Sequence, residues 1–245
     1  MHIYLSPHHD DVCFSVGHLA SETGGALVNA FTQSVYVAAR MDLPADPDAR
    51  LAAITELRRQ EDLRFCSAAG LTRHDLGLPE PPVLGLNPFD LTGLTEEVDR
   101  LSTKLIPCLL DLLPGGSDPQ SAALYCPMGI GGHRNHLSML LALRQAYEML
   151  GRRCAVFLYE DLHYASDAGT RERGLALAAK VFTGFQLSPI VMALDATATE
   201  RKMRWVGLYA SQHAQPPRVT DFIPASGLSP GPHEIVWRVS WPQRS

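Results

Sequence analysis

The first eleven residues constrain the fold of this chain more than any other stretch. An apolar run, Ile3-Tyr4-Leu5, has the character of a buried strand and is followed at once by Ser6-Pro7-His8-His9-Asp10-Asp11. In an open α/β sheet, ligands bind outside the carboxyl ends of the strands, so the residues that follow a strand build the site. Imidazoles and carboxylates at this position therefore predict an α/β fold with a polar site after its first strand.

The rest of the chain alternates between strand-like and helix-like segments. Apolar runs predict further strands near residues 26–31, 74–78, 122–126, 154–160 and 189–194, and a late edge strand near 236–241. Helical spacing predicts helices from about residue 12 and over 51–69, 92–113, 136–150, 170–183 and 198–211, the last after the capping box Thr197-x-x-Glu200. This repetition predicts a Rossmann-like, mostly parallel sheet with helices on both faces. No linker divides residues 1–245, which we expect to form a single domain.

Composition and charge argue against several classes of protein. The net charge of −5 and the lack of a basic run argue against a nucleic-acid partner. No stretch approaches the roughly 18 apolar residues that a membrane span needs. The five cysteines are far apart and odd in number, as in a reduced cytoplasmic protein, and the amino terminus lacks a secretory pattern. We therefore expect a cytoplasmic protein, which could form homo-oligomers through the apolar residues around Val236–Trp241.

A second polar cluster, Gly131-Gly132-His133-Arg134-Asn135-His136, follows another predicted strand. A catalytic zinc takes three protein ligands and leaves one position open for water. His8 and Asp11 can converge on one ion from a turn that enters a helix, and His136 would supply the third ligand. Asp10 would then be free to accept a proton from the metal-bound water. Two imidazoles and one carboxylate suit Zn²⁺ and tolerate Fe²⁺ or Co²⁺.

The simpler alternative is that these histidines cap helices or pack at turns, as a single histidine usually does. However, His133 and His136 are three residues apart, so at the junction of a loop and a helix they can face the same cavity. Two such clusters, each ending a predicted strand, favour a metal site over this alternative.

Both clusters resemble the signatures of a known family. Pro7-His8-His9-Asp10-Asp11 is similar to the Ala-His-Pro-Asp-Asp-Glu signature of the LmbE-like, or PIG-L, N-deacetylases. Gly132-His133-Arg134-Asn135-His136 is similar to the second signature of that family, Gly-His-x-Asp-His. Arg58-Arg59-Gln60-Glu61 resembles its Arg-x-x-Glu helix, and other similar segments extend the resemblance to about residue 212.

The resemblance implies a Rossmann-like fold and the zinc-dependent hydrolysis of an N-acetyl group, usually on a glucosamine-type sugar. It implies that His8, Asp11 and His136 are the zinc ligands. It further implies that Asp10 is the general base, and that His133, once protonated, stabilises the oxyanion.

Three residues are candidates for substrate contact. Arg58 matches an active-site arginine of the family, although without the resemblance an ion pair on its own helix would be the first expectation. His9 stands where the family has Pro, and it could contact substrate or face solvent in the turn. Asn135 stands where the family has Asp. A carboxylate at position 135 would raise the pKa of His133, whereas an amide orients the ring with less charge stabilisation.

Two classes of function follow. The first is a zinc-dependent hydrolase that removes an N-acetyl group from an N-acetylglucosamine-type sugar or conjugate, by attack of a metal-bound water activated by Asp10. The second is a non-catalytic descendant that binds zinc and sugar, to which Asn135 gives weight. Within the enzyme class, an amidase acting on a larger amide of an aminosugar conjugate is an alternative. The part of the substrate beyond the sugar would contact loops such as 33–50, 79–91 and 214–232, and His163 and Tyr164 could line the sugar pocket.

Overall fold

The first predicted strand lies at the centre of the sheet. In the computed structural model, which describes residues 1–114 and 121–241, β1 (His2–Ser6) pairs in parallel with β2 (Gly25–Gln33) and with β4 (Ala123–Pro127). Ile3, Tyr4 and Leu5 are all fully buried. A central parallel strand is covered on both faces, so it has to be apolar throughout rather than alternating.

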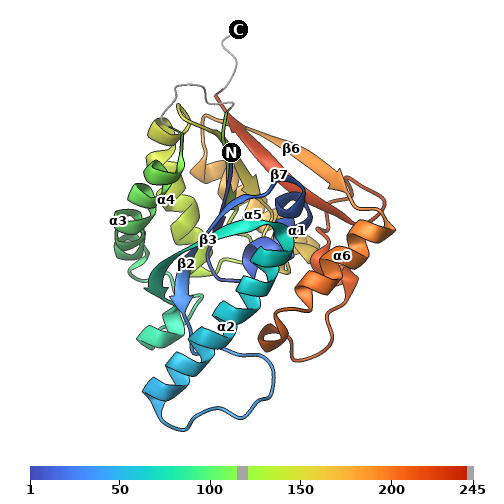
Figure 1. Cartoon of the computed structure of the whole chain (residues 1–245). Coiled ribbons are helices and arrows are strands. Elements are labelled where there is room, and N and C mark those ends of the chain that lie inside the picture. The colour runs from blue at the N-terminus through green and yellow to red at the C-terminus, as the bar shows by residue number, and fades with distance from the viewer. Residues whose placement is uncertain (115–120, 242–245) are drawn as a thin grey trace.

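Within the described residues, seven strands form one sheet in the order β3-β2-β1-β4-β5-β7-β6 (Figure 1). The remaining strands are β3 (Leu71–Pro79), β5 (Ala155–Tyr159), β6 (Gln186–Ala193) and β7 (His233–Ser240). β1 to β5 run parallel to one another, whereas β7 is antiparallel to both β5 and β6. The predicted Rossmann-like, mostly parallel sheet is confirmed.

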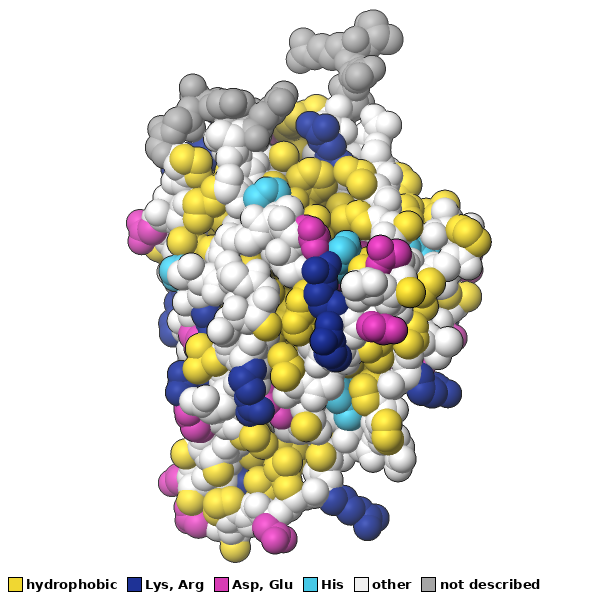
Figure 2. All heavy atoms as spheres, turned by 45° about the vertical axis from the view of Figure 1, so that its right-hand side comes forward, with side chains coloured by type: hydrophobic (Ala, Val, Ile, Leu, Met, Phe, Trp, Pro, Cys, Tyr) yellow, Lys and Arg dark blue, Asp and Glu magenta, His cyan; other side chains and the backbone are white. Residues whose placement is uncertain are grey.

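Helices cover both faces of this sheet (Figure 1). One face carries α3 (Leu94–Leu112), α4 (Arg134–Leu150) and α5 (Ala168–Val181), and the other carries α1 (Asp11–Thr23), α2 (Pro47–Ala69) and α6 (Ala196–Val206). The described loops also hold four short 3₁₀ helices, at Pro81–Leu84, Tyr164–Ser166, Ala210–Gln212 and Val219–Phe222. None of the described helices combines the length and the apolar character that crossing a bilayer requires. Acidic and basic side chains are interspersed over the face shown in Figure 2.

The position of β7 corrects the prediction of a late edge strand. β7 lies between β5 and β6, and β6 is the strand at the edge. Val236 and Val239 are therefore buried in the sheet, and they offer no surface for association with another copy. Trp241, which follows the strand, is 58% exposed. The apolar pattern of a strand does not show which neighbours it will pair with.

The amino-terminal caps explain where two helices differ from their predicted bounds. α2 begins four residues early, at Pro47, because the side chain of Asp46 accepts a hydrogen bond from the backbone of Ala49. α6 is capped by Asp195 rather than by the predicted capping box, and it ends at Val206 instead of residue 211. Both caps are aspartates, a residue type that is preferred to threonine at this position.

A buried ion pair anchors α1, whose first turn forms part of the site. α1 is kinked at Val16, and the carboxylate of Glu234 in β7 accepts the backbone N–H groups of His18 and Leu19, each at 3.0 Å. Lys202 in α6 lies 2.9 Å from Glu234, and both side chains are almost fully buried. Three elements are thus joined at one charged contact.

We expect Lys202→Met to lower the free energy of unfolding by about 3–5 kcal/mol, because it leaves the Glu234 carboxylate buried without a countercharge. Arg59→Met is the matched control, since Arg59 pairs with Glu56 on the exposed surface and its loss should leave the free energy of unfolding nearly unchanged. Urea unfolding of both variants measures the difference. Equal stability of the two variants would contradict the anchoring role of Lys202.

Candidate functional site

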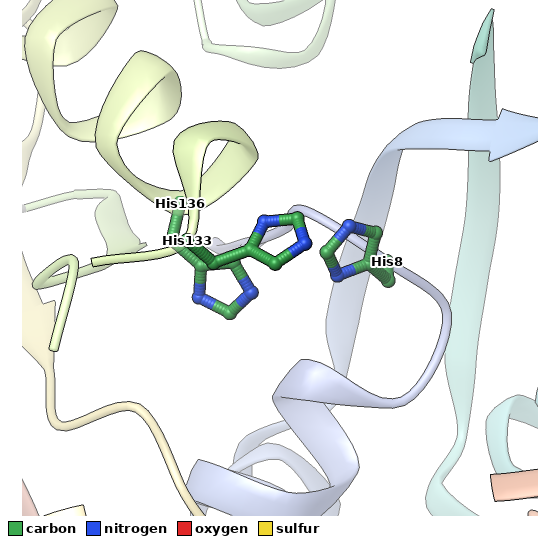
Figure 3. A group of neighbouring side chains, drawn as sticks. All are labelled: His8, His133 and His136. Carbon is green, nitrogen blue, oxygen red and sulfur yellow. The ribbon is translucent and has the colours of Figure 1, made fainter. Parts of the chain in front are cut away.

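The loops after β1 and β4 meet where the strand order reverses. From this point β2 and β3 continue to one side of the sheet and β5 to the other, which is the topological switch point where α/β sheets bind ligands. Figure 3 shows His8, from the loop after β1, facing His133 and His136 at the start of α4. The ring centre of His8 lies 4.8 Å from that of His133 and 5.2 Å from that of His136. The structure therefore brings the two sequence clusters together.

Asp11 lies between two of these imidazoles. Its Oδ2 atom is 3.1 Å from Nδ1 of His8, and its Oδ1 atom is 3.4 Å from Nε2 of His136. Asp11 is the first residue of α1, and its carboxylate also accepts the backbone N–H of His8 at 2.8 Å. The donor atoms of the three predicted ligands thus gather around one buried point.

Asn135 orients the ring of His8. Its amide nitrogen donates to the carboxylate of Glu97 in α3 at 2.9 Å, and a carboxylate only accepts, so the amide oxygen must face His8. That oxygen is 3.0 Å from Nε2 of His8, which therefore donates and leaves Nδ1 directed at Asp11. Hydrogen bonds of this kind fix the tautomer of histidines that bind metals. Asn135 is fully buried and does not line the cavity, so the expected contact with substrate is not seen.

Asp161 orients His136 in the same way. Its Oδ1 atom is 2.7 Å from Nδ1 of His136, and its Oδ2 atom accepts the backbone N–H of Ile130 at 2.8 Å. Nε2 of His136 is thereby left to face Asp11. The sequence did not reveal this role, because an aspartate that follows a strand is as typical of a cap for the next turn as of a residue in a site. Its neighbour Glu160 instead forms a buried ion pair with Arg171.

Opposite charges hold this cluster together. Burial lowers the pKa of His8, but the adjacent Asp11 carboxylate outweighs it and raises the pKa to about 9. Burial raises the pKa of Asp11, yet His136 and His8 hold it well below its usual range. Since a ligating imidazole must be neutral, metal binding at neutral pH has to displace a proton from His8.

These residues fit a divalent metal ion. Two imidazole nitrogens and one carboxylate are buried together, and each imidazole has its second nitrogen held by a protein partner. This donor set is typical of a mononuclear zinc site that keeps one position open. Ligand atoms of His8, His133 and His136 also lie within 4.8 Å of one another, which makes His133 an alternative ligand.

His133 is the amino-terminal cap of α4. Its Nδ1 atom accepts the backbone N–H of Asn135 at 3.2 Å, so the ring is neutral and carries its proton on Nε2. Burial, and then the charges of His8 and His136, lower the pKa of His133 to about 2. The resemblance implied a protonated ring at this position. The side chain of residue 135, which would favour that state as a carboxylate, contacts His8 and not His133.

Arg58 fixes the carboxylate of Asp10. Its guanidinium lies 3.3 Å from Asp10 Oδ1, donates to Ser34 Oγ at 2.9 Å, and forms a further ion pair with Glu80. Arg58 is 3% exposed and lines the cavity together with Asp10 and Glu80. An ion pair confined to its own helix is not formed, because Glu61 in α2 bonds to Ser211 instead.

His9 matches neither of its two expected positions. It is 1% exposed, and its Nδ1 atom lies 3.6 Å from the carboxylate of Asp62. It therefore neither faces solvent nor lines the cavity. The turn after β1 directs His9 into the packing between the loop and α2, and directs its neighbours His8 and Asp10 into the cavity.

A cavity of about 860 Å³ opens above these residues. All three loops that were expected to contact substrate contribute to its wall, as do His163 and Tyr164. The ring of Tyr164 packs at a right angle to that of His136 and lies against Gly131. A Cβ atom at Gly131, whose φ is 95°, would lie 2.4 Å from this ring, so the glycine is required there.

We expect Asp161→Asn to weaken metal binding about 10–100-fold, because the neutral amide leaves His136 a poorer ligand. Asp167→Asn is the matched control, since Asp167 caps α5 at the surface through the backbone of Thr170. Competition with a chelating dye measures both affinities. Unchanged affinity in the Asp161 variant would remove Asp161 from the support of the metal site.

This chain is similar to known deacetylases in sequence and in fold. No family model matches the sequence. The chain is 29% identical to 2'-N-acetylparomamine deacetylase of Streptomyces fradiae over 219 residues, which cover 86% of this chain and 72% of the relative.

Several solved structures of similar fold are also deacetylases. A deacetylase of teicoplanin biosynthesis superimposes with a TM-score of 0.73 at 19% identity, covering 100% of this chain and 99% of the other. The A40926 pseudoaglycone deacetylase gives a TM-score of 0.65 at 20% identity, covering 99% and 98%. At such identities these structures establish the fold alone. The chain is thus similar in sequence to one deacetylase and in fold to others, and the resemblance of its two signatures to the LmbE-like, or PIG-L, N-deacetylases agrees with this similarity.

Proposed function

We propose that this protein is a metal-dependent hydrolase that removes an N-acetyl group from an N-acetylglucosamine-type sugar or conjugate. The observation that carries the proposal is the convergence of His8, Asp11 and His136 at the base of a large cavity, with Asp10 beside them. The 29% identical relative is a deacetylase of an N-acetylated compound, which supports the same reaction class here.

A divalent ion bound by these ligands would polarise the acetamide carbonyl and lower the pKa of water. Zn²⁺ is our first choice for two imidazoles and one carboxylate, with Fe²⁺ and Co²⁺ as alternatives. One solved structure of similar fold, at 20% identity and a TM-score of 0.70, is a zinc-inhibited form of teicoplanin deacetylase. Activity should therefore be measured with each of the three metals, and at more than one zinc concentration.

Asp10 is the general base of this proposal. Arg58 holds its Oδ1 atom, and among the described residues the second oxygen has no hydrogen-bond partner. That oxygen is free to take a proton from the water that attacks the carbonyl. Because Arg58 is itself fixed by Glu80, the carboxylate has little freedom to rotate away from the cavity.

His133 acts as a neutral donor. Its Nδ1 atom is occupied by the backbone of Asn135, so only the Nε2 proton can reach the oxyanion that forms from the carbonyl. A neutral donor gives a weaker hydrogen bond than an imidazolium. It is also unsuited to supply a proton to the departing amine, so we assign both proton transfers to Asp10.

The substitution of Asn135 for aspartate does not by itself favour a non-catalytic protein. Asn135 still orients His8, and its own amide is held in place by Glu97. The residues to which we assign the reaction, namely His8, Asp10, Asp11, His133 and His136, all line the cavity. The hydrolase is therefore better supported than a descendant that only binds zinc and sugar.

We expect Asp10→Asn to lower kcat about 10²–10⁴-fold while metal content and fold stay unchanged, because the variant loses its base but none of the three ligands. Asp48→Asn, on the exposed first turn of α2, is the control for the substitution itself. Acetate release measures turnover. Full activity in the Asp10 variant would exclude it as the base.

A panel of N-acylated glucosamines separates the competing functions. Acetate release that a chelator abolishes supports the deacetylase. Faster release of a longer acyl group than of acetate would assign the site to an amidase. Stoichiometric metal without any release would support the non-catalytic alternative.

A further inference from the structure

The cavity is larger than the catalytic residues at its bottom require. Its volume of about 860 Å³ lies near the upper end of the roughly 300–1,000 Å³ that ligand sites usually enclose. The catalytic residues occupy the base, and a single aminosugar above them would leave the outer part empty. The outer part therefore points to a second component of the substrate.

Two exposed aromatic side chains form a rim around this outer part. Tyr36 is 52% exposed, Phe89 is 56% exposed, and both line the cavity. The ring of Phe89 packs at a steep angle to that of His133, so the rim is continuous with the catalytic residues at the bottom of the cavity. Three more exposed leucines lie in the same segment as Phe89: Leu84, Leu86 and Leu91. Exposed aromatic side chains that line a cavity, as Tyr36 and Phe89 do, indicate a surface that is covered in use.

The carboxylates that line the cavity are already paired. Asp10 and Glu80 contact Arg58, and Asp11 lies between two imidazoles. Asp221, at the outer wall, forms an ion pair with Arg218 at 2.7 Å. Apart from the second oxygen of Asp10, which we assign to the attacking water, no carboxylate oxygen of the described lining residues is left over for an ammonium group of the substrate. A cationic ligand would need such partners to offset its desolvation.

We infer that the substrate is an N-acetylglucosaminyl conjugate whose aglycone is uncharged and apolar or aromatic, and that this aglycone packs against the rim of Tyr36 and Phe89. This inference rests on the proposed deacetylation and names its substrate class. The occupant of the rim is the aglycone itself, because the rim continues directly into the catalytic cavity. A polycationic aminosugar oligomer, which offers no apolar surface, does not fit these walls.

Paired glycosides test the inference. The methyl and 4-methylumbelliferyl glycosides of N-acetylglucosamine share the reacting amide and differ only in the aglycone. We expect kcat/KM for acetate release to be about tenfold or more higher for the aryl glycoside, mainly through a lower KM, because its apolar surface is buried on binding. An N-acetylated cationic pseudodisaccharide should show no such gain over the methyl glycoside.

Two rim variants and one control locate the effect. Tyr36→Ser and Phe89→Ser should each reduce the aryl-to-methyl ratio of kcat/KM severalfold. Leu177→Ser removes an equally apolar, exposed side chain from α5, outside the cavity, and should leave the ratio unchanged. Equal values for the two glycosides in the unaltered enzyme, or a ratio that the rim variants leave intact, would overturn the inference.

Calorimetry separates failure of this inference from failure of the proposed reaction. The Asp10→Asn variant should bind the aryl glycoside about tenfold more tightly than the methyl glycoside, whether or not the unaltered enzyme releases acetate. Equal affinities together with acetate release would reject the inference and leave the reaction standing. Sedimentation velocity and flotation with phosphatidylcholine vesicles test other occupants. Self-association or vesicle binding that both rim variants abolish would assign the rim to a second copy or to lipid, and would also overturn the inference.

Discussion

The contact on which the rest of the site depends is the carboxylate of Asp11 between the imidazoles of His8 and His136. It exists because β1 and β4 are neighbours in the sheet although they are far apart in the chain. Each strand ends at the same edge, and each is followed by a turn that starts a helix, so two loops deliver ligands to one point. The buried anchor of α1 and the hydrogen bonds to the two imidazoles then limit how far these ligands can move.

The central strands and the residues of the cluster could be predicted because both depend on local patterns. Ile3-Tyr4-Leu5 is apolar throughout, and this marks a strand that is covered on both faces. The edge position of β6 could not be predicted, since pairing between β6 and β7 depends on contacts that a local pattern does not encode. The buried position of His9 was missed for a related reason: its partner, Asp62, comes from α2.

The residues that support the ligands were the hardest to recognise. Asn135 was expected to act on His133, its neighbour in the signature, but in the fold its side chain lies between His8 and Glu97. Asp161 comes from a third loop and carries no pattern of its own. Residues of this kind act by orienting another side chain, so only the assembled structure shows what they do. The same network explains how an amide is tolerated at position 135: beside Glu97, an aspartate would add a second buried negative charge, whereas asparagine donates a hydrogen bond.

The central claim is that His8, Asp11 and His136 hold one divalent ion. Anomalous diffraction from crystals of the zinc-reconstituted protein tests it most directly. We predict one stoichiometric peak per chain, about 2.0–2.2 Å from Nδ1 of His8, a carboxylate oxygen of Asp11 and Nε2 of His136. A peak bound by His133 with Asp11 out of reach, or no peak after reconstitution, would contradict it.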